Sequence, residues 1–190
     1  MQKYLLFIIL FGTLSSCMYG INPDLYTKEN LLLGLELERS KINDVKEIDL
    51  NAALYISIAK SKSKLTDKWY FVPLDIKKLH IPGLESYHLI VSTSGVVRGV
   101  RLNMKKNKFA ELSKNFVARY STVEPYYSDL QTFIDGNDVI ELTYSNNNKS
   151  TVVDITSKQL RQERIENYKV SARKGNALHQ RILKTLNINY

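Results

Sequence analysis

The chain has few cysteines and histidines, and this excludes several kinds of site. Its 190 residues contain one cysteine, Cys17, and three histidines, at positions 80, 88 and 179. One cysteine cannot form a disulfide within the chain, and no further cysteine or suitably spaced histidine completes a metal site with it. The histidines lack the His-x-x-x-His spacing of a helical metal site. The sequence therefore predicts a fold held together by packing, with no metal and no cofactor.

The chain also lacks a hydrophobic run long enough to cross a membrane. Residues 5–14 are largely apolar, but they number only ten, and a membrane-spanning helix needs about 20. Lys3 places a positive charge before this run, and the small residues Ser15 and Ser16 follow it. This layout is typical of a secretory signal peptide.

Cys17 stands directly after that signal. Leu14-Ser15-Ser16-Cys17 resembles the lipobox of bacterial lipoproteins, in which the chain is cut before the cysteine and the sulfur is joined to diacylglycerol. The resemblance implies cleavage between Ser16 and Cys17, and attachment of acyl chains such as palmitate at Cys17. Two or more acyl chains hold a protein stably at a membrane. The alternative is an ordinary signal sequence cut elsewhere, in which Cys17 is only a small apolar residue.

The residues after Cys17 indicate a location and a domain organisation. No acidic residue follows Cys17 directly, and in Gram-negative lipoproteins this favours the outer membrane over the inner one. We therefore expect a lipid-anchored protein of the bacterial cell envelope that faces the periplasm. Its predicted parts are a signal peptide (1–16), a lipidated tether (17–28), an α+β domain (29–156) and a basic helical tail (157–190).

Positive charge is concentrated in the predicted tail. Residues 157–190 contain eight basic and two acidic residues, whereas residues 17–156 contain 18 basic and 17 acidic ones. A Lys or Arg close to an anionic membrane contributes about 1 kcal/mol of binding. We therefore predict that the tail binds an anionic lipid surface or an acidic protein; export argues against nucleic acid. The alternative is a solvated helix whose charges only keep it soluble. The basic residues are Lys158, Arg161, Arg164, Lys169, Arg173, Lys174, Arg181 and Lys184.

Hydrophobic periodicity predicts an α+β fold, an antiparallel sheet with helices packed on one face. Residues 52–59 fit either a buried strand or a continuation of the preceding helix. In the second half of the tail, apolar residues at positions 178, 182 and 186 form one helical stripe. The other predicted elements are a strand at 31–37, a helix at 40–48 capped by Ser40, an edge strand at 69–76, a hairpin at 87–104, a helix at 109–120, three strands within 130–155, and helices from 157 onward.

Two segments are similar to a known family. Residues 34–48, GLELERSKINDVKEI, resemble the opening of small envelope lipoproteins of the BamE/SmpA-like type, whose fold is related to β-lactamase inhibitor proteins. Residues 95–120 are similar to a strand-helix unit of such lipoproteins. The resemblance implies two helices on an antiparallel sheet, with Ser40 capping a helix and Val45 in the core. The usual Gly-x-Pro turn after the first helix is replaced by residues 49–51, and no functional residue carries over.

No arrangement of residues in the sequence indicates catalysis. Ser92 and Ser94 lie in a segment without the G-x-S-x-G pattern or a following helix, so we predict that they belong to a hairpin turn. We therefore expect no enzyme activity. The predicted function is that of a membrane-anchored periplasmic lipoprotein that binds a protein or an envelope component. The alternative is an inhibitor or immunity-type lipoprotein that neutralises a periplasmic enzyme or toxin.

Overall fold

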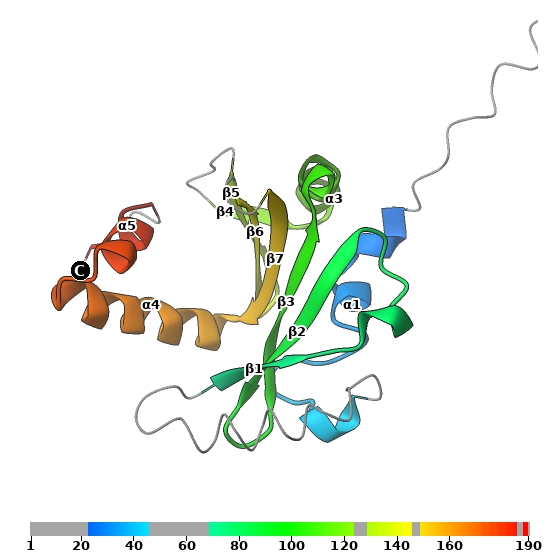
Figure 1. Cartoon of the computed structure of the whole chain (residues 1–190), viewed down its shortest axis with the longest axis horizontal. Helices are drawn as coiled ribbons and strands as arrows, with labels where there is room; N and C mark the ends of the chain where they lie inside the picture. Colours follow the sequence, from blue (N-terminus) through cyan, green and yellow to red (C-terminus); the bar gives the residue numbers. More distant parts are fainter. Residues whose placement is uncertain (1–22, 46–68, 124–128, 146–148, 186–187, 190) are drawn as a thin grey trace, which may run out of the picture.

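The fold is α+β and is built on one antiparallel sheet of seven strands, as the sequence predicts. A computed structural model describes residues 23–45, 69–123, 129–145, 149–185 and 188–189. The strand order is β1-β2-β3-β7-β6-β5-β4, and every neighbouring pair is antiparallel (Figure 1). The strands are β1 (Trp69–Pro73), β2 (Leu84–Ser92), β3 (Val97–Lys105), β4 (Ser121–Val123), β5 (Leu130–Asp135), β6 (Asp138–Ser145) and β7 (Ser150–Ser157).

The helices lie on both sides of this sheet. Figure 1 shows α1 and α3 on one side of the strands, and α4 running from the end of β7 toward α5 on the other. Within the described ranges, four short 3₁₀ turns connect other parts of the fold. The α-helices are α1 (Lys28–Leu31), α3 (Phe109–Arg119), α4 (Lys158–Arg173) and α5 (Ala177–Thr185), and the 3₁₀ turns are η1 (Pro23–Tyr26), η2 (Ile42–Asp44), η3 (Ile76–Lys78) and η4 (Lys106–Lys108).

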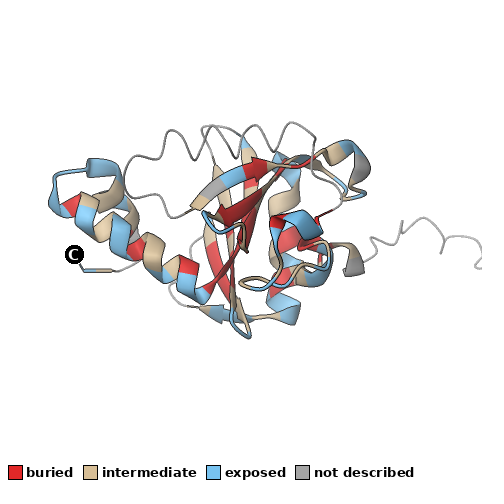
Figure 2. Cartoon of the chain, turned by 90° about the horizontal axis from the view of Figure 1, so that it is seen from below, coloured by how far each residue is buried: buried red, intermediate tan, exposed pale blue. Residues whose placement is uncertain are grey.

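One face of the sheet carries the main hydrophobic core. Side chains alternate between the two faces of a strand, so residues paired across neighbouring strands share a face. Leu102, Val153 and Leu142 are paired across β3, β7 and β6, and all three are fully buried. Figure 2 shows buried residues concentrated along the strands, with exposed residues frequent on α4 and α5.

Helix α3 closes this core, as its predicted apolar stripe requires. Leu112 and Phe116 are buried, and the ring of Phe116 meets that of Phe133 from β5 edge-on, at 5.6 Å between centroids. Such aromatic pairs add about 1 kcal/mol beyond the area they bury. The predicted helix at 109–120 is thus confirmed, and it is held by packing on the core face.

The opposite face of the sheet is polar, and α4 lies over it. Arg101, Asp154 and Glu141 are paired across β3, β7 and β6, one position along each strand from the core residues. Helix α4 contacts this row through Arg161, which donates a hydrogen bond from Nε to Glu141 Oε1 at 3.0 Å. Helix α4 belongs to the predicted basic tail, for which the sequence predicts no packing face, and ion pairs hold it on the side of the sheet opposite α3.

The first part of the chain also differs from prediction. Residues 31–37 form the end of α1 and a turn instead of a strand, with Leu33 and Gly34 at positive φ. Ser40 accepts a hydrogen bond from the Glu36 backbone N–H and caps no helix, and the only helical structure described there is η2. Val45 is buried in the core, as the family resemblance implies. The predicted strand or helix at 52–59 lies outside the described residues.

The predicted tether at 17–28 includes residues that belong to the fold. Tyr26 is buried in the main core and donates its hydroxyl hydrogen to the Pro82 carbonyl oxygen at 2.9 Å. Lys28 forms ion pairs with Asp135 at 2.7 Å and Asp138 at 3.1 Å. The Lys28 ion pairs fasten the beginning of the described chain to the β5–β6 hairpin, and the Tyr26 hydrogen bond fastens it to the turn before β2.

The remaining strand predictions are confirmed, with one shift in β3. A β-bulge interrupts the β2–β3 register, so that Ile90 pairs with Gly99 but Val91 pairs with Val97. An inserted residue shifts the side-chain alternation along a strand, and here Val97 is buried in the core whereas Val96 is only half-buried. The bulge residue is Arg98. Strand β4 was not predicted; it has only three residues, too few for a periodic pattern.

Candidate functional site

A cleft lies between the polar face of the sheet and the helices α4 and α5. Its volume is about 590 Å³, within the range of roughly 300–1,000 Å³ that small-molecule sites occupy. Its lining combines arginines and carboxylates from the strands and α4 with apolar residues from both helices. The residues that line it are Arg101, Asp129, Leu130, Glu141, Thr143, Tyr144, Ser145, Asp154, Arg161, Arg164, Ile165, Tyr168, Leu178, Arg181 and Ile182.

Local sequence explains where α4 begins and how α5 turns back toward it. Ser157 caps α4 by accepting a hydrogen bond from the Leu160 backbone N–H at 3.0 Å, the usual role of serine at this position. Gly175, with φ of +88°, ends the helix in the left-handed conformation that glycine tolerates best. Asn176 then accepts a hydrogen bond from the backbone N–H of His179 at the start of α5.

A small second core joins the two helices. Leu183 of α5 is fully buried and belongs to the same cluster as Ile165 and Ala172 of α4. The predicted stripe at 178, 182 and 186 is therefore not the packing face of α5: Leu178 is 64% exposed and lines the cleft. Position 186 lies outside the described residues. The α4–α5 hairpin thus turns Leu178 and Ile182 toward the ligand-sized space.

The floor of the cleft is an ordered row of ion pairs. Arg101 donates two hydrogen bonds to Asp154, from Nε at 2.7 Å and from Nη2 at 2.6 Å. This two-point geometry is the strongest that arginine forms with a carboxylate. The hydrogen bond to Asp154 raises the pKa of Arg101 more than burial lowers it. Arg101 also lies over the ring of Phe71, 5.2 Å from its centroid.

Another arginine on this floor, Arg164, has one donor atom without a partner. Its Nη2 is 3.7 Å from Asp154 Oδ2, an ion pair too long for a hydrogen bond. Its Nη1 is shielded from water and has no hydrogen-bond partner. Burial lowers the pKa of Arg164, but the charges of Asp154, Tyr168 and Glu141 and a hydrogen bond with the Tyr168 side chain outweigh it and hold the pKa above its ordinary value. Arg164 therefore stays charged while only part of its guanidinium is bonded.

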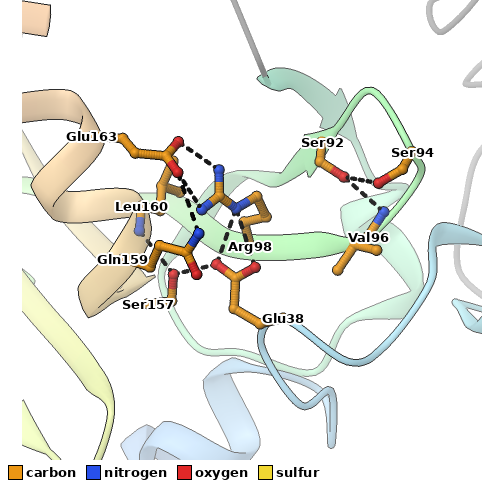
Figure 3. A network of polar contacts seen from close by, with 9 residues as sticks. All are labelled: Glu38, Ser92, Ser94, Val96, Arg98, Ser157, Gln159, Leu160 and Glu163. Carbon is orange, nitrogen blue, oxygen red and sulfur yellow. Dashed lines mark hydrogen bonds and ion pairs between the residues drawn. The ribbon is translucent and has the colours of Figure 1, made fainter.

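A second network fixes α4 to the sheet beside the cleft. Arg98 donates from Nε to Glu38 at 3.0 Å and from Nη1 to Glu163 at 2.7 Å, as Figure 3 shows. The Ser157 hydroxyl, which caps α4, also donates a hydrogen bond to Glu38. Only 7% of the Arg98 side chain is exposed. Arg98 thus joins the loop after α1, the β3 bulge and the first turns of α4.

The eight basic residues predicted to bind an anionic surface are divided by the fold. Arg161, Arg164 and Arg181 line the cleft, and Lys169 forms an ion pair with Glu166 at 2.9 Å. The other four are exposed on the helices and on the turn that joins them, namely Lys158, Arg173, Lys174 and Lys184. The predicted lipidation and cleavage residues, Cys17 and Ser16, lie outside the described residues.

The sequence contained a partial signal for the cleft. Arg161, Arg164 and Tyr168 are spaced i, i+3 and i+7, which places them on one side of a helix. Arg101 and Asp154 occupy positions that face away from the core in their strands. Their meeting depends on the β3–β7 register and on α4 crossing the polar face, and neither follows from local periodicity.

The residues considered for catalysis or metal binding have structural contacts. Ser92 and Ser94 lie in the β2–β3 turn, with their hydroxyl oxygens 2.8 Å apart, and Ser92 accepts a hydrogen bond from the Val96 backbone N–H (Figure 3). Among the described residues, no three His, Cys, Asp or Glu side chains form a group that could hold a metal ion. In the same ranges, no helix is long and apolar enough to cross a bilayer.

No protein-family model, curated protein or solved structure matches the chain. The resemblance to BamE/SmpA-like lipoproteins and to the lipobox therefore rests on the sequence patterns alone.

Proposed function

We propose that the protein is a lipid-anchored binding protein of the bacterial envelope, and that its binding site is the cleft between the sheet and α4–α5. The observation that carries this proposal is an open cleft of ligand size, lined by both charged and apolar side chains. Ion pairs on the polar face of the sheet hold the side chains of its floor in place, so that they do not fill the cleft. Sites of this composition bind ligands by shape and by a few placed polar groups. The proposal includes no catalytic step.

The proposed anchor would hold the cleft close to the membrane. Five residues, 18–22, separate Cys17 from the first described residue, Pro23, so six Cα–Cα steps join the two. An extended chain spans at most about 3.5 Å per residue, so the described fold would begin within roughly 20 Å of the acyl chains. The ligand would then be met at, or just above, the periplasmic side of the membrane, with the outer membrane favoured.

The exposed cations of α4 and α5 would strengthen attachment to an anionic surface. Replacing three of them by glutamate should weaken binding of residues 18–190 to anionic vesicles about 100-fold at low salt, because each cation contributes about 1 kcal/mol. Equal binding of the altered chain would remove this role. A control chain has the same charge change at exposed positions elsewhere. The replaced residues are Arg173, Lys174 and Lys184, and the control residues are Lys105, Lys106 and Lys114.

Site-specific crosslinking in cells tests the binding role of the cleft. A photo-reactive phenylalanine analogue at Leu178 lies in the cleft, whereas the same analogue at Val117 lies on α3. The two side chains are 64% and 51% exposed, so the probes have similar access to solvent. We expect the probe at 178 to capture a component of the envelope fraction that the probe at 117 does not. Equal capture at both sites, or none at 178, would contradict the proposal.

The identity of the captured component distinguishes an envelope binding protein from an inhibitor or immunity-type lipoprotein. A lipid, wall polymer or assembly protein would support a binding protein of the envelope. A secreted toxin or a periplasmic enzyme, blocked when the protein is added, would support the inhibitor or immunity-type role instead.

A further inference from the structure

The charges that line the cleft are one negative group short of balance. Four arginines line it, at positions 101, 161, 164 and 181, against three carboxylates, at positions 129, 141 and 154. Arg101 occupies both oxygens of Asp154, and Arg161 binds Glu141. The two carboxylates nearest Arg164 are therefore already committed to other arginines. Arg164 therefore shares its nearest carboxylates with Arg101 and Arg161.

The geometry of Arg164 identifies what is missing. Buried donors in folded proteins are almost always bonded, and leaving one without a partner costs about 1–3 kcal/mol. Arg164 has Nη1 without an acceptor and Nη2 at 3.7 Å from its nearest carboxylate oxygen. An anionic group entering the cleft could accept from this guanidinium after a small side-chain rotation, as often occurs at binding sites. A planar or tetrahedral oxyanion suits the fork of arginine donors.

Apolar side chains lie beside this charge. Ile165, Leu178 and Ile182 line the cleft from the two helices, and Leu130 lines it from β5. Leu178 is the most exposed large apolar residue in the described ranges. A ligand that covers it would remove apolar surface from water, which contributes about 25 cal/mol per Å².

From this juxtaposition we propose that the cleft binds an amphipathic anion, in which a single carboxylate or phosphate monoester is joined to an alkyl chain. The head group pairs with Arg164, and the chain lies against Leu178 and Ile182. This ligand class rests on the proposed role of the cleft as a binding site. Fatty acids and single-chain lipids that end in an unsubstituted phosphate are two sources of this chemistry.

Calorimetry with soluble probes tests the ligand class. The acylated full chain is held in phosphatidylcholine nanodiscs, and empty nanodiscs provide the blank. Octanoate and octyl phosphate carry both parts of the ligand, octanol carries the tail alone, and acetate and inorganic phosphate carry the head alone. We expect one octanoate or octyl phosphate per chain, bound at least about tenfold more tightly than the single-part probes. The stronger of the two indicates the source. Binding of octanol equal to octanoate, or no binding of either amphiphile, would overturn the proposal.

Two pairs of variants locate the binding. Arg164→Gln should weaken octanoate binding about tenfold or more, because it removes the charge-assisted donors, whereas Arg173→Gln, exposed on the same helix, should not. Leu178→Glu changes an exposed residue that the alkyl chain of the ligand would contact. It replaces apolar surface by a negative charge in the cleft, so it should also weaken the binding of octanoate. Its control is Val170→Glu, at a 51% exposed position outside the lining. Unchanged binding in both Arg164→Gln and Leu178→Glu would refute the proposal.

Failure of this proposal can be separated from failure of the proposed function. If the crosslinker at Leu178 captures an envelope component but no amphiphile binds, the cleft remains a binding site for another ligand class. If neither occurs, both proposals fail.

Discussion

Arg98 provides the sharpest test of how the cleft is built. Its guanidinium is nearly fully buried and bonds Glu38 on one side and Glu163 on the other. Arg98→Met keeps most of the side-chain volume but leaves both carboxylates without their cation. We expect a lower free energy of unfolding and a loosened first half of α4, because Glu163 lies on that helix.

The structure sets the size of this effect. Removing one partner of a buried ion pair costs about 3–5 kcal/mol, because the remaining charge stays buried. The Glu38 and Glu163 side chains are 31% and 30% exposed, so water can partly solvate the carboxylates. We therefore expect about 3 kcal/mol, at the low end of that range. Glu163 and Glu38 raise the pKa of Arg98 despite its burial, so this stabilisation is complete below the ordinary arginine pKa and does not vary near neutrality.

Urea unfolding followed by circular dichroism measures the loss. With a slope of about 2 kcal/mol per M, 3 kcal/mol corresponds to a midpoint shift of about 1.5 M. Arg39→Met is the matched control, because Arg39 also pairs with a glutamate but is 81% exposed, and exposed pairs contribute about 0–1 kcal/mol. Neutralising Glu38 and Glu163 as glutamine in Arg98→Met should recover much of the loss. Equal shifts for Arg98→Met and Arg39→Met would refute the reasoning.

Two further predictions concern the sheet. Burial, and then the charge of Arg101, lower the pKa of His88 in the folded protein. The contribution of His88 to stability is therefore complete above the ordinary histidine pKa, and it is lost as the pH falls through the lowered pKa of the folded state. Wild type should therefore lose more stability than His88→Gln between about pH 7 and about pH 5, and equal losses in urea titrations would contradict this. Gly99→Ala would place a Cβ 2.7 Å from a backbone carbonyl oxygen of β7, so it should cost about 2 kcal/mol, or about 6 °C in Tm. Gly34→Ala meets no atom within 4 Å but has a φ of +74°, and should cost about half as much; a Gly99→Ala chain as stable as Gly34→Ala would show that β3 and β7 can separate freely.

Most of the sheet was predictable from sequence because its signals are local. The strands within 130–155 alternate around clear turn residues, and α3 has a continuous apolar stripe. The strand predicted at 31–37 is wrong because three consecutive leucines fit a strand as well as a short helix followed by a turn. The β3 bulge at Arg98 changed which valine at the start of the strand enters the core, because an inserted residue interrupts the period of two.

The cleft was less predictable because it depends on long-range pairing. The concentration of positive charge after residue 157 indicated a functional surface, but the fold directs part of it inward. Arg161 and Arg164 reach carboxylates on strands β6 and β7, whereas charge counting treats all eight cations alike. Only the crossing of α4 over the polar face distinguishes the residues of the cleft from those exposed to solvent.

The anchor at Cys17 is the claim on which the location of this cleft depends, and intact mass spectrometry tests it most directly. Protein purified from the envelope fraction should begin at Cys17 and carry the added mass of a diacylglyceryl group with its acyl chains. A mature chain with an unmodified Cys17 thiol, or one that keeps residues 1–16 in the cytosol, would contradict the account.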